Sequence, residues 1–500
     1  MKHYWNHRTI RLIIYFASFS ATAATIHFIP NLKHFQDNTG AVATFNVGGA
    51  INQKSAFFQS LGTNGRSCAT CHRPDQAFSL SARGASELYE QTRGRDPLFA
   101  SVDGANCPTA RSDDRSAHSL MLQRGLFHLG MTMPAKAQFT IVAVHDPYGC
   151  AITNDPATGR QVISVYRRPE PSTNLRFLSA VMFDGRETLL PLNNSQTFQN
   201  NLRVDLTDQA LSAVMGHAQA SVEPTPEQLA EIVDVELAFS TAQIRDDIAG
   251  SLQHGGAMGG PQMLSAQQYY PGMNDALGGD PTGTKFNPQA FSMFTAWDQS
   301  DANDRDSLGD ERQDGNERKA ARAEIAAGEK IFNTQPAIIA GVHGLNDNPA
   351  LGSPASITGT CSTCHDTPNV GNHSVALALD IGVSRQPGSE TDAAIIAALR
   401  QLTTPDLPVY EVRGCMNPLK PGEPVNYYTS DPGRALITGQ CSDMNLGKGP
   451  ILRGLAARAP YLHNGAAANL RELVNFYNQR FQMGLTGKQK NELVAFLNSL

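Results

Sequence analysis

The pattern Cys-x-x-Cys-His, which occurs twice, constrains this chain more than any other feature. The first copy covers residues 68–72 and the second covers residues 361–365. Two thiols one helical turn apart can add to the two vinyl groups of one haem, and the adjacent histidine can then bind the iron. The composition predicts about 0.004 chance copies per chain, so two accidental copies are not credible. The sequence therefore predicts two covalently bound haem c groups and a redox function.

Each copy assigns an attachment pair and a proximal iron ligand. A four-cysteine zinc site has no need for the following histidines, and a thioredoxin-type redox pair needs a βαβ context that the sequence does not show. Both alternatives are therefore weaker than haem attachment. The predicted haem-binding residues are Cys68, Cys71, His72, Cys361, Cys364 and His365.

The first 23 residues have the pattern of a secretory signal peptide. Lys2, Arg8 and Arg11 precede an apolar run over residues 12–19, and the small residues of 21–23 follow it. An uncleaved membrane anchor is the alternative reading, but the run is short for a membrane span. No other stretch approaches 18 consecutive apolar residues, so we expect a periplasmic mature chain without a membrane span.

Charge and length exclude some classes of protein. The chain has 40 Lys and Arg against 46 Asp and Glu, a net charge of −6, and no long basic run, which argues against nucleic-acid binding. Loss of the first 23 residues would remove three positive charges and leave −9. At roughly 150 residues per domain, the 500 residues suggest two or three domains.

Four further cysteines lie outside the two motifs. Export places them in an oxidising compartment, where paired cysteines persist. Pairing of neighbours, Cys107 with Cys150 and Cys415 with Cys441, keeps each bridge local. Free thiols remain the alternative, because spacing alone does not determine connectivity.

Hydrophobic periodicity predicts mostly helices, separated by loops rich in glycine, aspartate, asparagine and proline. Residues 139–144 and 161–166 are β-rich, with turn residues between them, and favour a hairpin-like insertion. The predicted helices cover residues 55–61, 173–182, 225–242, 318–332, 470–480 and 488–500.

Three further segments resemble the bacterial dihaem cytochrome c peroxidase family, which includes MauG-like enzymes. Residues 448–455, KGPILRGL, look like the family's VPxLRNV segment. Residues 459–465, APYLHNG, match APYFHNG, and residues 183–186, FDGR, match WDGR. The resemblance covers about 50–72, 165–245 and 319–500, whereas 73–164 and 246–318 look like insertions.

The resemblance implies a mainly α fold: two cytochrome c-like haem domains with long loop insertions and, from the β-rich segments, a small β-hairpin element. The N-terminal haem would be catalytic and the C-terminal haem would transfer electrons. The expected division is a signal peptide over 1–23, an N-terminal haem domain over 24–245 with insertion 73–164, a loop-rich linker over 246–318, and a C-terminal haem domain over 319–500.

Catalytic residues follow from the same resemblance, with one departure. The family places a glutamine and a glutamate after the WDGR segment, and Gln209 matches the glutamine. The glutamate position falls near Gln219, which cannot act as an acid or base, whereas His217 could. We therefore expect Gln209, His217 and Gln219 at the catalytic haem; an ordinary helix-end histidine is the alternative reading of His217.

Register with the family places Tyr477 as the second ligand of the C-terminal haem, the MauG-like choice, with Met483 as the fallback ligand. A half-buried core aromatic is the alternative reading of Tyr477. Arg186 and Arg453 are candidates to pair with haem propionates, or else to form ordinary salt bridges. Phe183 stands where the family has a tryptophan between the haems.

The resemblance also implies one Ca²⁺ between the domains, bound partly through backbone carbonyls, with Arg458 and Pro460 at the matching positions. The implied function is a peroxidase-like oxidoreductase that reduces hydrogen peroxide with electrons from a small periplasmic donor, a cytochrome or a cupredoxin. A MauG-like oxidase or oxygenase that uses high-valent haem iron on another substrate is one alternative. A non-enzymatic electron carrier is the other. The sequence is compatible with a homodimer but does not fix the oligomeric state.

Overall fold

The computed structural model describes most of the chain beyond the amino terminus. Most of the expected signal peptide and part of the expected linker lie outside the described residues. None of the described helices is long and apolar enough to cross a membrane. The described residues are 1, 27–298, 312–386, 395, 397–398, 400, 402–417, 420 and 422–500.

The prediction of a mainly α fold is wrong. The described residues form 16 strands in six sheets beside 11 helices, with 31% helix and 18% strand. Most strands are short, so they leave little local periodicity, and β3 (Gly40–Asn46), β6 (Thr140–His145) and β13 (Ala378–Leu379) pair with segments far away in the sequence. The sequence pattern therefore predicted α5 (Pro226–Ala238), α8 (Arg312–Thr334), α11 (Leu470–Arg480) and α12 (Gly487–Asn498) but missed α2 (Ala82–Thr92), α4 (Phe198–Gly216) and most of the sheets.

The N-terminal sheet joins both ends of the first half of the chain. Its central strands, β3 (Gly40–Asn46) and β9 (Phe239–Asp246), pair antiparallel, and β2 (Phe35–Gln36) and β10 (Gly250–Ser251) flank them. Helix α5 (Pro226–Ala238) runs directly into β9. The helix predicted to reach residue 242 therefore ends four residues earlier, where pairing with β3 outweighs the local helical pattern.

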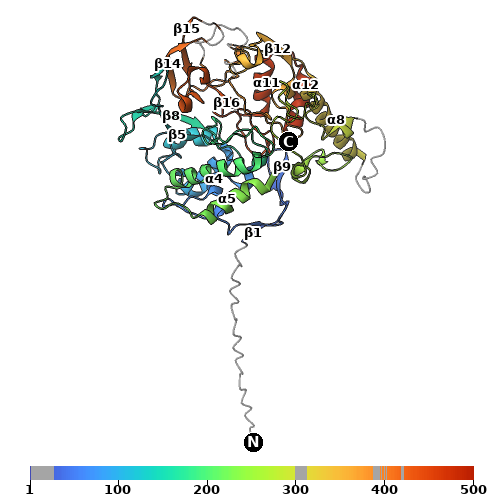
Figure 1. Ribbon diagram of the computed structural model, residues 1–500. Helices are drawn as coiled ribbons and strands as arrows, with labels where there is room; N and C mark the ends of the chain where they lie inside the picture. The colour runs from blue at the N-terminus through green and yellow to red at the C-terminus, as the bar shows by residue number, and fades with distance from the viewer. Residues whose placement is uncertain are drawn as a thin grey trace.

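Two three-stranded sheets lie together at the upper left of Figure 1. One has the order β5 (Phe127–Thr132), β8 (Gln161–Arg167), β7 (Ile152–Asn154). The other has the order β15 (Pro424–Thr429), β14 (Val409–Met416), β6 (Thr140–His145). The turn residues before 161–166 do close a hairpin, but its first strand is β7. The predicted pairing of 139–144 with 161–166 is wrong, because β6 pairs with β14.

A shared core and two disulfides stabilise this region. Ile163, Val165, Tyr410 and Val412 of the two sheets are fully buried in one hydrophobic cluster. Cys107 is bonded to Cys150, and Cys415 to Cys441, so the neighbour pairing is confirmed. Segment 73–164 is thus fastened to the C-terminal part of the chain by strand pairing as well as by packing.

The C-terminal helices pack around an aromatic core on the right of Figure 1. Helix α8 (Arg312–Thr334) crosses α12 (Gly487–Asn498), which packs on α11 (Leu470–Arg480). At the crossing, a Cβ on Gly328 would lie 2.0 Å from the carbonyl oxygen of Glu492, so only glycine permits this approach. Phe291, Phe294, Trp297, Phe332, Phe476 and Phe496 fill the core.

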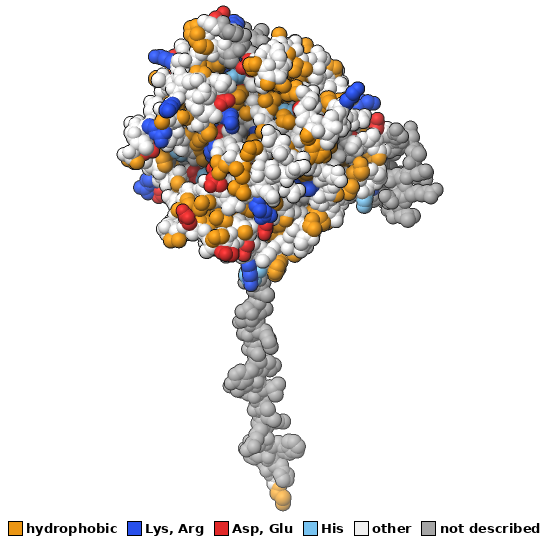
Figure 2. Space-filling view, in the orientation of Figure 1, with side chains coloured by type: hydrophobic (Ala, Val, Ile, Leu, Met, Phe, Trp, Pro, Cys, Tyr) orange, Lys and Arg blue, Asp and Glu red, His pale blue; other side chains and the backbone are white. Residues whose placement is uncertain are grey.

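Helix α4 (Phe198–Gly216) packs on α5 at the lower side of Figure 1. The predicted helix over residues 173–182 is reduced to a single 3-10 turn at Leu175–Phe177. Acidic and basic side chains are interspersed over the face shown in Figure 2. The remaining elements are β1 (Phe28–Ile29), β4 (Ile51–Asn52), α1 (Cys68–Cys71), α2 (Ala82–Thr92), α3 (Ser119–Arg124), α6 (Gly260–Ser265), α7 (Thr295–Asp298), β11 (Ala337–Ala340), β12 (Ser356–Gly359), β13 (Ala378–Leu379), α10 (Ala435–Thr438) and β16 (Gly447–Lys448).

Candidate functional site

The first Cys-x-x-Cys-His motif forms the short helix α1 and the residue after it. A capping box between Ser67 and Thr70 starts the helix, which places Cys68 and Cys71 one turn apart. The ring Nδ1 of His72 donates to the carbonyl oxygen of Phe78 at 3.2 Å. Because a carbonyl only accepts, Nδ1 carries the ring proton and Nε2 carries the lone pair that an iron ligand needs. Burial lowers the pKa of His72 to about 4, which keeps the ring neutral, as a metal ligand must be.

The second motif repeats this arrangement. Thr360 and Thr363 form its capping box, and a 3-10 turn, η7 (Cys361–Thr363), carries the first thiol. The ring Nδ1 of His365 donates to the carbonyl oxygen of Gly371 at 2.6 Å, again six residues along the chain. Burial lowers the pKa of His365. Both motifs therefore present a neutral imidazole with the same nitrogen available.

The cysteines divide cleanly into two classes. Cys68, Cys71, Cys361 and Cys364 are free thiols, whereas the other four are disulfide-bonded. In the described part of the chain, the four motif thiols do not gather into one group of metal ligands. This separation argues against a four-cysteine zinc site and fits two thioether-linked haems.

Two buried arginines that have no acidic hydrogen-bond partner among the described residues also fit a haem. Arg453 donates from Nη1 to Met293 Sδ at 2.7 Å and to the Asn369 carbonyl at 3.0 Å. Arg458 donates to the Ile451 carbonyl at 2.9 Å. The Nε atom of each is buried without a hydrogen-bond partner. Burial lowers the pKa of Arg453 to about 9, an environment that an anionic propionate would relieve.

Arg186 differs from these two arginines. Its guanidinium lies 3.1 Å from the Asp184 carboxylate and 3.9 Å from that of Glu187. Asp184 is also bound by Arg167, which in turn binds Asp431 at 2.7 Å. Arg186 therefore already faces two carboxylates of the chain. This arrangement fits an ordinary salt bridge better than it fits pairing with a haem propionate.

His217 lies at the end of α4 and belongs to a charged network. Its Nδ1 is 2.5 Å from Asp103 Oδ2, and the other oxygen of Asp103 is ion-paired with Arg66. Burial alone would raise the pKa of Asp103, but the hydrogen bond from His217 and the charge of Arg66 outweigh burial and lower it. Burial is the main cause of the lowered pKa of His72, and the nearby His217 lowers it further. The network therefore lies close to the first motif.

Gln219 joins the same region through its neighbours, whereas Gln209 stands apart. Asn64 donates from Nδ2 to the His217 carbonyl at 2.8 Å and to Gln219 Oε1 at 3.3 Å. Gln209 lies about two turns earlier on α4, half-buried, and among the described residues it has no hydrogen bond to this network. Of the three predicted catalytic residues, the structure thus brings two together.

Sequence reasoning missed Arg66 and Asp103. Arg66 is fixed by carbonyl acceptors as well as by the carboxylate, since its Nε donates to Pro97 at 2.7 Å and Nη2 to Leu98 at 2.7 Å. Asp103 lies in segment 73–164, which the resemblance does not cover and which carries no motif. Only the fold brings it to His217, so no sequence signal could have found it.

Tyr477 lies on α11 in an aromatic environment beside the second motif. Its ring centroid is 5.5 Å from that of Phe476 and 5.8 Å from that of Phe481. Burial raises its pKa, and the thiols of Cys364 and Cys361 act in the same direction, which places the phenol within their electrostatic reach. Met483 is buried in the adjacent core, at 4% exposure.

Phe183 lies among charged and aromatic neighbours. Its ring stacks on His463 with a centroid distance of 4.4 Å, and Arg167 lies over it at 5.1 Å. His463 is within hydrogen-bonding distance of the Ser384 hydroxyl, at 3.1 Å, and burial lowers its pKa to about 4. This histidine thus packs the interior rather than meeting solvent.

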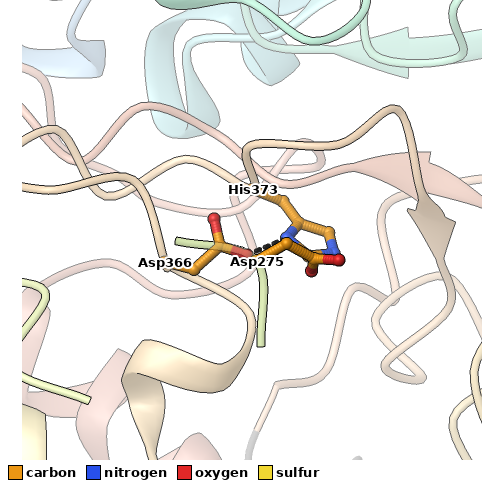
Figure 3. A group of neighbouring side chains, drawn as sticks. All are labelled: Asp275, Asp366 and His373. Atoms are coloured by element: carbon orange, nitrogen blue, oxygen red, sulfur yellow. Dashed lines mark hydrogen bonds and ion pairs between the residues drawn. The ribbon is translucent and has the colours of Figure 1, made fainter. Parts of the chain in front are cut away.

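A buried group of ligand-type side chains follows the second motif: Asp275, Asp366 and His373 (Figure 3). His373 Nδ1 donates to Asp366 Oδ2 at 2.7 Å, and Asp366 Oδ1 accepts the Ser374 backbone N–H at 2.7 Å. Sequence reasoning did not single out these residues. Their bonds close the loop after His365, so the group fixes the backbone that carries the Gly371 acceptor.

The position implied for calcium has other partners. The carbonyl oxygens of Arg458 and Pro460 both accept hydrogen bonds from the guanidinium of Arg168. The carbonyl of Leu80 accepts a third, at 2.6 Å. Among the described residues, no carboxylate is hydrogen-bonded or ion-paired to Arg168. These residues do not fit a calcium ion, which needs oxygen ligands that are not already bound to donors.

Comparison of this sequence with known proteins tests the family resemblance. No family model matches the chain. It is 32% identical over 150 residues to the cytochrome-c peroxidase IdrP2 of Denitromonas iodatirespirans, a match that covers 28% of this chain and 36% of that protein. The chain thus spans about a third of the length of this curated relative.

A solved structure of a MauG-like protein associated with microbial copper homeostasis covers 83% of this chain and 89% of its own. Its identity is 11% and its TM-score 0.26, values too low to support an inference. The sequence match, together with the two motifs and the three similar segments, confirms the resemblance stated above. Over those 150 residues the chain is similar to a cytochrome-c peroxidase, and this similarity supports its resemblance to the bacterial dihaem cytochrome c peroxidase and MauG-like family.

Proposed function

We propose that this protein is a periplasmic dihaem c-type cytochrome that reduces hydrogen peroxide with electrons from a small redox protein. The observation that carries the proposal is the pair of His217 and Asp103 close to the first motif. When bound, the N-terminal haem would supply the iron at which peroxide accepts two electrons. The residues of the chain must then supply protons and orientation.

His217 can move a proton between the two peroxide oxygens. Its Nδ1 faces Asp103, so Nε2 is the nitrogen that remains for substrate. The carboxylate fixes the orientation of the ring, in the way that a paired acid orients a catalytic histidine. Arg66 keeps Asp103 ionised and immobile. Gln219 can only hydrogen-bond, so we assign it a positioning role.

The C-terminal haem, held by Cys361, Cys364 and His365, would receive electrons from a small donor such as a cytochrome or a cupredoxin. Under this proposal the chain divides into an N-terminal haem domain over 24–245 and a C-terminal one over 319–500, joined by 246–318. Arg453 and Arg458 would bind propionates, since both are buried and have no acidic hydrogen-bond partner in the part of the chain that the structure describes. The negative charge of the propionates would neutralise these two buried guanidinium groups and so stabilise the haem-bound protein.

A MauG-like oxidation of another substrate is the second candidate. Tyr477 favours it, because a phenol lies within electrostatic reach of the second motif, where the family register predicts a ligand. Phe183 disfavours it, since phenylalanine carries a transient radical far less readily than the tryptophan of the family. The two candidates are distinguished by peroxide turnover with a reduced cytochrome, which only the peroxidase sustains.

The test uses the exported holoprotein. His217→Ala should lower kcat/KM for peroxide by roughly 10²–10⁴-fold, the range that general acid–base groups contribute. His145→Ala is the matched control, because His145 is exposed and far along the chain from both motifs. Wild-type activity in His217→Ala would contradict the proposed role. A spectrum without high-spin iron in any redox state would instead favour the electron carrier.

A further inference from the structure

An arginine that is largely but not fully buried, Arg168, connects three separate segments of the chain. Arg168 follows β8, and its Nη2 donates to the carbonyl oxygens of Leu80 and Arg458, each at 2.6 Å. Its Nη1 donates to the carbonyl oxygen of Pro460. Its own backbone N–H donates to the carbonyl of His463 at 2.8 Å. One side chain thus holds together the loop before α2, the strand end at β8 and the segment around residue 460.

The charge balance at this point is unusual for a largely buried cation. Glu170, the nearest acid in the sequence, is ion-paired with Lys448 at 3.0 Å. A second guanidinium, that of Arg458, is close enough to affect Arg168. Burial, followed by this neighbouring charge, lowers the pKa of Arg168 to about 9, so the group is still protonated at neutral pH. The dipoles of the three backbone carbonyls that it binds are therefore the main compensation for the positive charge of Arg168.

Three carbonyl oxygens that converge on one positive charge form the kind of cage that binds a metal cation. Calcium takes six to eight oxygen ligands at close range, usually with carboxylates among them. A guanidinium offers five N–H donors in a fixed planar fork, so it can bind several carbonyls at once. The guanidinium of Arg168 already binds the three carbonyl oxygens, and the guanidinium of Arg458 is nearby. A divalent cation at this place would therefore be repelled by two positive charges.

We infer that the guanidinium of Arg168 is the built-in structural cation of this protein, in place of the calcium ion that the family resemblance implies. The chain then needs no divalent metal to connect Leu80, Arg458 and Pro460. Its haem sites keep their geometry at any calcium concentration. The inference does not depend on the reaction proposed above, because it concerns stability and metal content alone.

The wild-type holoprotein gives the first test. It is dialysed against a calcium chelator or against millimolar CaCl2, and its calcium content, melting temperature and visible spectrum are measured. We expect no stoichiometric calcium and the same melting temperature and spectrum in both buffers. One tightly bound calcium per chain, or a melting temperature that falls with the chelator and recovers with calcium, would overturn the inference.

Substitution gives the second test. Arg168→Met keeps much of the stem but removes the donors, which leaves three buried carbonyls unsatisfied. Its melting temperature should fall by roughly 5–10 °C in both buffers, and Arg168→Lys, which keeps the charge, should fall less. Arg203→Met is the control, because the Arg203–Asp234 ion pair is exposed. A wild-type melting temperature in Arg168→Met would also overturn the inference; if that variant fails to fold, the wild-type measurement decides.

Discussion

At the scale of single residues, the structure explains how this chain prepares two histidines for metal binding. His72 and His365 each donate a ring N–H to a backbone carbonyl six residues later. This bond selects the tautomer in which Nε2 carries the lone pair that a metal ligand needs. The motif itself determines these residues, so the sequence predicted them without any knowledge of the fold.

His217 and Asp103 illustrate what the sequence could not determine. The resemblance led to His217 because the family glutamate is replaced by Gln219. The carboxylate that completes the pair comes from a different segment, and no periodicity or motif links position 103 to position 217. Chemistry that is assembled by non-local packing leaves no trace in a single sequence.

Asp103→Asn tests this pair. The pKa of Asp103 is lowered in the folded protein, so its contribution to stability is present above the unfolded pKa of 3.8 and is lost as the pH falls through the folded value. We expect the variant to lose about 3 kcal/mol of unfolding free energy at pH 7, because Arg66 keeps a buried charge. Denaturant titration at pH 7 and pH 3 measures this.

The difference between wild type and Asp103→Asn should shrink at pH 3. Asp234→Asn, which removes an exposed ion pair, serves as the control and should cost no more than about 1 kcal/mol. Equal stabilities of Asp103→Asn and wild type at pH 7 would show that the network does not contribute to folding.

At the scale of elements, prediction succeeded where local periodicity was strong. Helix α11 occupies the predicted residues 470–480, and α12 begins within one residue of its predicted start. The β-rich character of β6 and β8 was predicted, but the pairing of β6 was not, because its partner β14 lies more than 250 residues away. Pairing over that distance depends on the packed molecule, not on the pattern within either strand.

Gly328→Ala tests the close crossing of α8 and α12. The added Cβ would lie 2.0 Å from a backbone oxygen, so one helix must move. We expect a loss of about 2–4 kcal/mol in unfolding free energy. Gly315→Ala, in the same helix with nothing within 4 Å, should instead gain roughly 0.5–1 kcal/mol. Similar effects of the two substitutions in thermal denaturation would refute the crossing.

Glu236 gives α5 a pH-dependent stability. Burial raises its pKa from 4.5 to about 8, and its Oε2 has no hydrogen-bond partner. Between these values the folded protein holds a proton that the unfolded chain has released, so stability falls as the pH rises. Wild type should lose roughly 1.4 kcal/mol per pH unit relative to Glu236→Gln.

Chemical denaturation of the holoprotein at pH 5 and pH 7 measures this slope. Glu223→Gln, at an exposed position just before α5, is the control. Parallel stability curves for wild type and Glu236→Gln would mean that this carboxyl group is not buried in its neutral form.

At the scale of the whole molecule, the chain combines two haem motifs with strand-rich segments that tie distant parts together. β6 pairs with β14, β3 pairs with β9, and Arg168 connects three segments. The Cys-x-x-Cys-His pattern by itself located both motifs. The amount of β-structure was not predicted, because strands such as β3, β5 and β6 lie outside the segments that the resemblance covers and most of the strands inside them are short.

The central claim is that two haems are covalently attached, one through Cys68 and Cys71 and the other through Cys361 and Cys364. Mass spectrometry of the exported protein under denaturing conditions tests it most directly. We predict the polypeptide mass plus exactly two haem groups, with one group lost when either cysteine pair is changed to serine. The bare polypeptide mass, together with the absence of a Soret band, would contradict the account.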